Sequence, residues 1–197
     1  MAESPTLGAL HSANSSGIDE QSYREVLTRF ATGVTVVTTL EDAPDGPQPW
    51  GTTVNSFTGI SLDPPLVMVS IGRERSIHPI IERTNRFGVN ILGEDSQALS
   101  DCFAGAPSTL PREAFCNADF ALGEAGLPVL SAAIAYLSAE VERVIEAGDH
   151  TMYLGKVIET ACRDEELGWP LLYFRRRYLS IERAAQPDLR GKPDTLR

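Results

Sequence analysis

Short runs of β-branched and aliphatic residues, each bounded by proline, glycine or aspartate, recur along this 197-residue chain. Such runs predict strands, because β-branched side chains pack well on a pleated surface and turn residues end the pairing. We expect strands at 33–40, 51–62, 66–71, 87–92, 136–146, 151–161, 171–174 and 178–181. With only a few short helices between them, these strands favour an all-β barrel over a doubly wound α/β sheet.

Two connecting segments and three of the expected strands carry further expectations. Residues 41–49, rich in Pro, Gly and Asp, are expected to form a loop, and the strand at 66–71 is expected to be buried on both faces. Residues 106–129 lack periodicity and are expected to form a long, functional loop with one short strand. The segments at 171–174 and 178–181 are expected to close the barrel sheet.

Three short helices are expected outside the barrel. The first is amphipathic, about three turns long, and begins at the capping-box spacing of Ser22. Ser76 is expected to cap the second. The third is expected to run from Ser96 to Phe103, with Asp95 as its cap and Gly105 as its stop.

The chain is interpreted as a single folded domain with two tails. Residues 1–18 are small and polar and predict a flexible N-terminal extension. The domain is expected to span 19–184, and residues 185–197 are expected to form a flexible C-terminal tail.

Charge and cysteine content limit the partners and the compartment. A formal net charge of −10 disfavours nucleic acid and anionic membranes as partners. The sequence contains no run of about eighteen apolar residues, the length needed to span a bilayer. The N-terminal residues lack the basic and apolar regions of a signal peptide. The three cysteines form no C-x-x-C pair, and their odd number argues against a disulfide framework. A reducing, cytoplasmic location is therefore expected.

Signatures of several enzyme classes are missing from the sequence. It contains neither the G-x-G-x-x-G nor the G-x-x-x-x-G-K-[ST] nucleotide motif, and no G-x-S-x-G nucleophile motif. The three histidines, His11, His78 and His150, show no ligand spacing, so no metal site is expected.

One segment stands out for its chemistry. Residues 51–57 place hydroxyl and amide side chains beside a glycine in an expected strand, which is costly if those groups are buried unpaired. They could offer hydroxyl and backbone N–H groups to a phosphate and an amide to a heteroaromatic ring. An exposed, Thr-rich strand is an equally good interpretation of the residues alone.

Taken in order, the segments resemble the flavin reductase family, the short-chain class that supplies reduced flavin to two-component monooxygenases. The resemblance spans roughly 22–182 in collinear order. It rests on ATGVTVVTT (31–39), GTTVNSF (51–57), SLDPPLVMVSIG (61–72), FGVNIL (87–92), FAG (103–105), AGDHTMYLGKV (147–157) and PLLYFRRRY (170–178). It implies a mainly β fold, the FMN-binding split barrel, which is a Greek-key β-barrel with a few short peripheral helices. It also implies a homodimer with flavin near the subunit interface.

The same resemblance implies a set of cofactor contacts. The segment 51–57 would line the flavin, 70–72 would approach the isoalloxazine or ribityl chain, and 103–105 would also touch the cofactor. Arg73, Ser76 and Ile77 would lie near the phosphate. The implied cofactor-binding residues are Gly51, Thr52, Thr53, Val54, Asn55, Ser56, Phe57, Ser70, Ile71, Gly72, Arg73, Ser76, Ile77, Phe103, Ala104, Gly105, His150 and Tyr178.

His150 is the implied catalytic residue. It would hold the nicotinamide and could give a proton to reduced flavin, while Tyr178 would make a second contact with the pyridine nucleotide. The alternative for His150 is a turn histidine bonded to its own hairpin. Trp50 stands where many members of the family have a histidine, and Thr52-Thr53 also departs from the usual pattern. These departures bear on flavin preference rather than on flavin binding itself.

The implied activity is that of an NAD(P)H:flavin oxidoreductase. Hydride would pass from C4 of NADH or NADPH to N5 of free FMN or FAD, and the reduced flavin would serve a monooxygenase, reached by diffusion or contact. The sequence leaves both choices of cofactor open. One alternative is a split-barrel flavoprotein that keeps FMN tightly bound and acts on another small organic substrate. The other is a flavin-binding protein without catalysis.

Overall fold

The computed structural model describes residues 17–111, 114–163 and 168–181. Within these ranges strands far outnumber helices. The expected N-terminal extension (1–18) and C-terminal tail (185–197) lie outside them, apart from residues 17 and 18. The elements in chain order are α1 (Glu20–Leu27), β1 (Thr32–Gly33), β2 (Thr35–Ala43), β3 (Gly46–Val54), β4 (Thr58–Leu62), β5 (Pro65–Gly72), α2 (His78–Thr84), β6 (Arg86–Leu92), α3 (Gln97–Ala104), the 3-10 turn η1 (Ala114–Asn117), β7 (Phe120–Leu122), β8 (Pro128–Leu130), β9 (Ala133–Ala147), β10 (His150–Cys162), β11 (Leu172–Phe174) and β12 (Arg177–Leu179).

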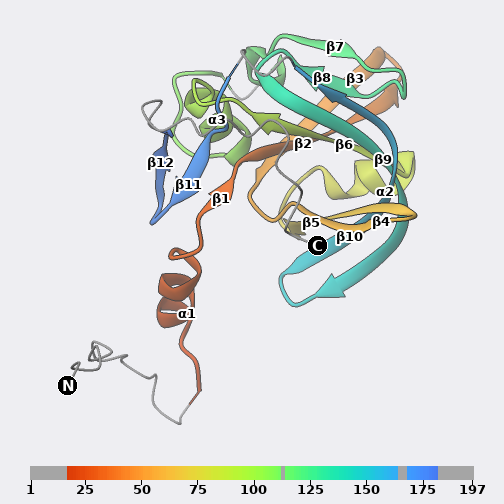
Figure 1. Ribbon diagram of the computed structural model, residues 1–197. Helices are drawn as coiled ribbons and strands as arrows, with labels where there is room; N and C mark the ends of the chain where they lie inside the picture. Colours follow the sequence, from red (N-terminus) through yellow and green to blue (C-terminus); the bar gives the residue numbers. More distant parts are fainter. Residues whose placement is uncertain (1–16, 112–113, 164–167, 182–197) are drawn as a thin grey trace, which may run out of the picture.

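Seven strands form one curved antiparallel sheet in the order β3-β2-β6-β9-β10-β5-β4 (Figure 1). Between β5 and β6 the chain crosses the β9–β10 pair, which is a Greek-key type of connection. Strands β3 and β4 are the two edges of the sheet, although only residues 55–57 separate them in sequence. The barrel is therefore split beside these three residues, and the mainly β split barrel is confirmed.

Strand β2 is buried on both faces. Val37 packs inside the barrel with Phe87, whereas Val36 packs on the outer face with Phe103. Neighbouring residues of a strand point to opposite faces, so one strand serves two cores. This explains why the run at 33–40 contains no charged residue.

Strand β5 was expected to be buried on both faces, and this was wrong. Val67, Val69 and Ile71 are buried, but the residues between them are only partly covered. The inner face alone meets the barrel core, as is common in antiparallel sheets.

The prediction of a loop at 41–49 was also wrong. β2 continues to Ala43 and β3 begins at Gly46, so most of these residues pair in a hairpin. Pro47 and Pro49 are tolerated because β3 is an edge strand, where an N–H on the outer side needs no partner strand. The strand expected at 51–62 is interrupted at residues 55–57 and becomes the end of β3 and all of β4.

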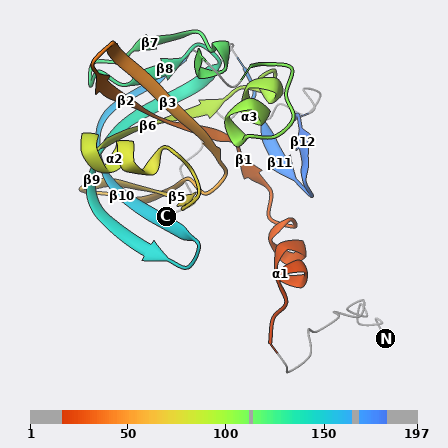
Figure 2. The ribbon, with the colours of Figure 1, turned by 180° about the vertical axis from the view of Figure 1, so that it is seen from behind.

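The last two strands do not close the barrel sheet as predicted. They form a separate three-stranded sheet with β1, in the order β1-β11-β12. This small sheet lies beside α3, outside the barrel (Figure 2). The expected loop at 106–129 contains η1 and the β7–β8 hairpin, one strand more than predicted.

Helix α1 extends away from the barrel in both views (Figures 1 and 2). Its cap is Asp19, whose Oδ1 accepts from the Ser22 backbone N–H at 2.9 Å, so the expected start at Ser22 was wrong. None of its residues is buried. The amphipathic pattern is confirmed, but the helix has 8 residues and is shorter than the three turns expected, because it ends at Leu27. Its apolar side chains Tyr23, Val26 and Leu27, together with Phe30 just after the helix, are 52–75% exposed.

The caps of the other two helices differ from expectation. Helix α2 has Ile77, not Ser76, at its N-cap. Helix α3 is capped by Ser96, not Asp95, and neither cap residue makes a side-chain capping hydrogen bond to its own helix. Gly105 ends α3 in the left-handed conformation, as predicted, with φ of 75°. Within the described part of the chain, no helix is long and apolar enough to cross a membrane.

Cys102 and Cys116 form a disulfide, with Cα atoms 6.1 Å apart. The expectation against disulfides was therefore wrong. An odd count guarantees one unpaired thiol, here the exposed Cys162, but does not prevent the other two from pairing. The fold brings the 3-10 turn against α3, a proximity that sequence spacing does not reveal.

Candidate functional site

A small pocket opens where the barrel is split, and we call it the split pocket. Its volume is about 140 Å³. Its wall combines the end of β3, the end of β5 and the start of β10. The last two meet because His150 pairs directly with Gly72 across the β5–β10 ladder. The lining residues are Thr52, Thr53, Val54, Asn55, Ser56, Ser70, Ile71, Gly72, Glu74, Arg75 and His150. All but Glu74 and Arg75 were predicted to contact a cofactor.

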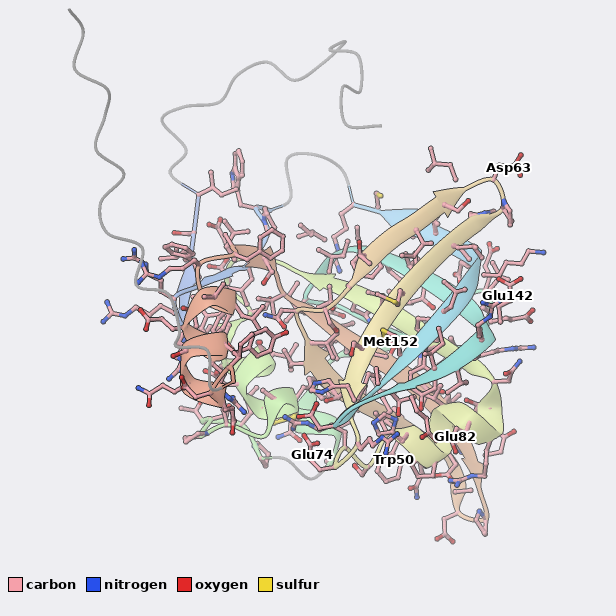
Figure 3. All side chains as sticks on the ribbon, turned by 90° about the horizontal axis from the view of Figure 1, so that it is seen from below. Trp50, Asp63, Glu74, Glu82, Glu142 and Met152 are labelled. Carbon is pink, nitrogen blue, oxygen red and sulfur yellow. A yellow bond between two sulfur atoms is a disulfide. The ribbon has the colours of Figure 1, made fainter. Side chains whose placement is uncertain are left out.

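A larger hollow of about 720 Å³ adjoins the split pocket, and we call it the aromatic cavity. The two share Thr52 and Arg75 in their walls, so they are contiguous. Four aromatic side chains line it, together with the predicted residues Gly51, Ser76, Ile77, Phe103 and Gly105. Figure 3 shows Trp50 and Glu74 toward the same edge of the molecule, opposite Asp63 at the tip of the β4–β5 hairpin.

Gly51 permits the close approach of an aromatic ring. A Cβ at this position would lie 2.6 Å from Phe103 Cε1 and 3.2 Å from the Phe115 ring. Those two rings meet edge to face, with centroids 4.9 Å apart. Glycine is favoured here because a side chain would occupy the space that these two rings fill.

Thr52 carries a polar atom that lacks a partner. The residue is 3% exposed, and its Oγ1 makes no hydrogen bond with any described residue. An unpaired buried hydroxyl is costly and is typical of a place where a ligand completes the bonding. Because Thr52 borders both hollows, the residues present fit a flavin, whose ring edge and ribityl chain both hydrogen-bond.

Two other hydroxyls of the 51–57 segment are used within the protein. Ser56 Oγ donates to the Ser70 carbonyl at 2.6 Å and accepts from the Ser70 N–H at 3.0 Å, which ties β5 to the residues after β3. Thr53 Oγ1 donates to the Ser100 carbonyl at 2.7 Å. These bonds fix the wall of the split pocket, while the Asn55 side chain is exposed at its rim.

His150 stands at the mouth of the split pocket, with 46% of its side chain exposed. Its Nδ1 lies 2.7 Å from Asp149 Oδ1. A carboxylate can only accept, so Nδ1 carries the proton and Nε2 is left for another partner. This hydrogen bond, and the charge of the imidazolium, lower the pKa of the Asp149 carboxyl. The residue therefore bonds within its own hairpin and also lines the pocket.

Arg75 was missed by the sequence analysis. It lines both hollows and is 38% exposed. Its Nη1 donates to the Ala104 carbonyl at 2.7 Å, and its Nε lies 3.2 Å from Glu74 Oε1. The turn bond from the Arg75 N–H to the Gly72 carbonyl, 3.0 Å, aims it inward. The sequence places arginines at both 73 and 75 in this turn, which indicates a basic wall. It does not show which of the two arginines faces the pocket.

Several predicted contacts are not brought to these hollows. Arg73 pairs with Glu146 at 2.7 Å, and Phe57 packs against the barrel core. Ala104 contributes its carbonyl to Arg75 but is not part of either wall. The 106–129 segment, expected to be functional, supplies Phe115 and Phe120, which were not among the predicted contacts.

Tyr178 lies behind α3, away from both hollows. Its hydroxyl donates to Asp101 Oδ1 at 2.8 Å and contacts Ser100 Oγ at 3.0 Å. Burial raises the pKa of Tyr178 to about 12, so the phenol stays protonated. Since Ser100 also holds Thr53, Tyr178 supports the pocket wall from one layer behind.

Comparison with known proteins points to the same family as the sequence resemblance. The family model described as "Flavin reductase like domain" matches residues 27–182. The NADH-dependent flavin reductase StyB of Pseudomonas fluorescens is 38% identical over 82% of this chain and 89% of its own length. HsaB of Rhodococcus jostii, the reductase subunit of a flavin-dependent monooxygenase, is 33% identical over 84% of this chain and 80% of its own. The solved structure of the Streptomyces globisporus NADH:FAD oxidoreductase SgcE6 superposes with a TM-score of 0.75 at 31% identity, covering 88% of this chain and 99% of that one.

Proposed function

This chain belongs to the flavin reductase family, and from that premise we propose that it is an NAD(P)H:flavin oxidoreductase that supplies reduced flavin to a partner monooxygenase. One observation carries the proposal furthest. The split pocket joins His150 to the 52–56 segment, and the unpartnered hydroxyl of Thr52 lies in its wall. Hydroxyl, amide and imidazole groups thus converge on one hollow, as binding of a flavin and a nicotinamide requires.

The protein's part in such a reaction is to bind and orient. When bound, a flavin accepts hydride at N5 from C4 of the reduced nicotinamide, and this chemistry belongs to the two cofactors. The Thr52 hydroxyl offers a hydrogen bond at the buried end of the pocket, and Arg75 offers positive charge at the junction with the aromatic cavity. The Nε2 of His150, held by the Asp149 bond, is placed to hydrogen-bond the nicotinamide carboxamide or to pass a proton to the flavin product. Correct orientation at close approach supplies much of the acceleration in reactions of this kind.

For the nicotinamide we propose NADH, because StyB and SgcE6 are named for NADH. NADPH remains the alternative. Either FMN or FAD can be the flavin. Because the donor is reduced nicotinamide, we propose a cytoplasmic location. The cysteine count no longer supports that location, since Cys102 and Cys116 form a disulfide.

For the recipient of reduced flavin we propose a flavin-dependent monooxygenase, in line with the name of HsaB. The net charge of −10 would favour encounter with a basic surface on that oxygenase. Reduced flavin can also pass by free diffusion, so no stable complex is required.

We also propose a homodimer. The apolar face of α1, formed by Tyr23, Val26 and Leu27, is exposed, as is Phe30 just after the helix. Exposed apolar patches of this kind mark interfaces. Phe30 shares a shallow hollow with Asn55, and Asn55 also borders the split pocket. A second copy docked on α1 would therefore lie next to the flavin site.

Light scattering after gel filtration tests this assembly. Val26→Asp places a charge on the apolar face of α1 and is expected to give monomers. Gln21→Asp places the same charge on the opposite face of α1 and is expected to leave the dimer intact. A monomeric wild-type protein would contradict the proposed homodimer.

The proposed activity is tested by NADH consumption with and without added free flavin. We expect oxidation of NADH that depends on FMN or FAD and saturates with either, and NADPH measured alongside ranks the donors. A protein that carries tightly bound FMN and oxidises NADH only with another organic substrate would instead be a split-barrel flavoprotein acting on that substrate. Binding of flavin without any consumption of NADH would indicate a flavin-binding protein without catalysis.

A further inference from the structure

His78 is a buried histidine that has no part in the proposed reaction so far. It is the first residue of α2 and is 8% exposed. Each of its ring nitrogens has a partner: Nε2 lies 2.7 Å from the Gly72 carbonyl oxygen, and Nδ1 lies 2.7 Å from the Tyr153 hydroxyl. The ring therefore connects the last residue of β5 to the interior of the barrel, where Tyr153 is fully buried on β10.

These two partners decide which ring nitrogen carries the proton. A carbonyl oxygen can only accept, so Nε2 carries a proton and donates it to Gly72. Burial raises the pKa of Tyr153 to about 12, so the phenol keeps its proton. Its hydroxyl has no other hydrogen bond among the described residues, and a buried hydroxyl without an acceptor is costly. Tyr153 therefore donates to Nδ1, and the ring of His78 is held as its Nε2–H tautomer.

The Gly72 carbonyl is free for this bond because of its place in the sheet. Gly72 pairs with His150, and the N–H of the residue after Gly72 donates to the carbonyl of the residue before His150 at 2.9 Å. This pattern marks Gly72 and His150 as a non-hydrogen-bonded pair, in which the Gly72 carbonyl points away from β10. That carbonyl instead accepts from the His78 Nε2–H and, at 3.0 Å, from the Arg75 N–H.

The bond from His78 acts on the split pocket from behind. Gly72, Arg75 and His150 all line that pocket, whereas His78 lines neither hollow. Movement of the Gly72 carbonyl would shift the β5 side of the wall against the β10 side. It would also loosen the turn that aims Arg75 inward. A buried hydrogen-bond network whose members are all paired makes the groups that it connects rigid.

We propose that His78 is a positioning residue for hydride transfer. Its Nε2–H holds the Gly72 carbonyl and so sets the spacing between the flavin side of the split pocket and His150. The inference rests on the proposed function, because it concerns the geometry of that reaction. A misplacement of about 1 Å can slow a reaction on the order of a hundredfold. Loss of the bond is therefore expected to lower the rate of flavin reduction more than the affinity for flavin.

Two variants of nearly equal length separate the hydrogen bond from the packing. His78→Gln keeps an N–H donor near the place of Nε2, whereas His78→Met fills the same space without a donor. Anaerobic single turnovers of the full chain, with bound FMN and saturating NADH, give the rate of flavin reduction. We expect His78→Met to lower this rate by roughly tenfold or more, and His78→Gln to restore most of it. The Kd for FMN is expected to change little in either variant.

Val69→Ala is the matched control for a loss of stability. Val69 is also on β5 and buried in the barrel core, but it does not line the split pocket. The change leaves a cavity and is expected to lower Tm, while the rate of flavin reduction stays at the wild-type value. If the rates of Val69→Ala and His78→Met both fell only in proportion to the folded fraction, His78 would be part of the core alone and the proposal would be overturned.

Nitrogen NMR of the wild-type chain, labelled at histidine, is a test that needs no variant to fold. It reports which nitrogen of each ring carries the proton. The proposal requires the Nε2–H form at His78. The Nδ1–H form would overturn it, because the Gly72 carbonyl would then receive no hydrogen bond from the ring.

The rate of the wild-type protein keeps this proposal apart from the proposed function. If the wild-type protein reduces FMN with NADH and His78→Met is equally fast, only the role of His78 is refuted. If the wild-type protein does not reduce FMN, the proposed function itself is refuted, and the role of His78 in hydride transfer falls with it.

Discussion

Replacing Thr52 with valine should stabilise the free protein and weaken flavin binding. The side chain is 3% exposed, and its hydroxyl has no partner among the described residues. Valine keeps the shape and removes the unpaired hydroxyl, whose burial costs about 1–3 kcal/mol. We therefore expect the free energy of unfolding to rise by about 1 kcal/mol, which raises Tm by roughly 2–4 °C in a chain of this size.

The same change should weaken flavin binding. If the Thr52 hydroxyl bonds the flavin, its removal costs the net value of a neutral hydrogen bond, about 0.5–1.5 kcal/mol. That corresponds to a Kd for FMN roughly 2-fold to 12-fold higher. Quenching of flavin fluorescence measures this Kd, and thermal unfolding followed by circular dichroism measures the first effect.

Thr35→Val is the matched control. Thr35 is also 3% exposed and lies on the neighbouring strand, but its Oγ1 donates to the Val54 carbonyl at 3.0 Å. Its replacement should lower stability by about 1 kcal/mol because a satisfied hydrogen bond is lost. If Thr52→Val lowered Tm as Thr35→Val does, and left the Kd for FMN unchanged, the assignment of Thr52 to the flavin site would be refuted.

Three further changes test the walls of the site. Gly51→Ala places a Cβ 2.6 Å from the Phe103 ring, so it should lower the free energy of unfolding by about 1–3 kcal/mol and weaken flavin binding. An unchanged thermal melting curve would contradict this packing. His150→Asn should raise the KM for NADH roughly tenfold, because one hydrogen bond to the nicotinamide is lost, and should leave the Kd for FMN unchanged. An unchanged KM for NADH with a raised Kd for FMN would exclude a role of His150 in binding the nicotinamide. Cys116→Ser opens a loop of 14 residues and should cost about 3 kcal/mol in non-reducing buffer; equal stability with and without reductant in the wild type would count against the disulfide.

The parts of the fold that were predictable depend on neighbours in sequence. The run at 87–92 alternates and is bounded by turn residues, and it forms β6 as expected. Gly105 ends α3 because glycine readily adopts the left-handed conformation of this helix end, which depends on the local backbone alone. Such features need no knowledge of distant strands.

The errors arise where distant segments decide the outcome. The residues at 41–49 contain enough turn formers to look like a loop, but pairing with the rest of β2 and a place at the sheet edge make them a hairpin. Nothing in the segments at 171–174 and 178–181 says that they pair with β1 rather than with the barrel. The partner of a strand is a property of the whole fold.

In the candidate site, too, the residues set by local sequence were predicted and those set by distant segments were missed. The resemblance named the segment at 52–56 and His150, and the register that pairs His150 with Gly72 brings them together. It named Arg73 and missed Arg75, because the turn after β5 decides which of the two guanidinium groups lines the pocket. It also gave no sign of Phe115, whose position depends on a left-handed turn and a disulfide that the odd cysteine count concealed.

The central claim is that free flavin is a turnover substrate of this protein. Anaerobic mixing of a catalytic amount of protein with NADH and excess FMN or FAD tests it directly, with the flavin absorbance followed over time. We predict that many equivalents of flavin are bleached per protein molecule, with matching loss of NADH. Bleaching that stops at one equivalent, or flavin binding with no loss of NADH, would contradict it.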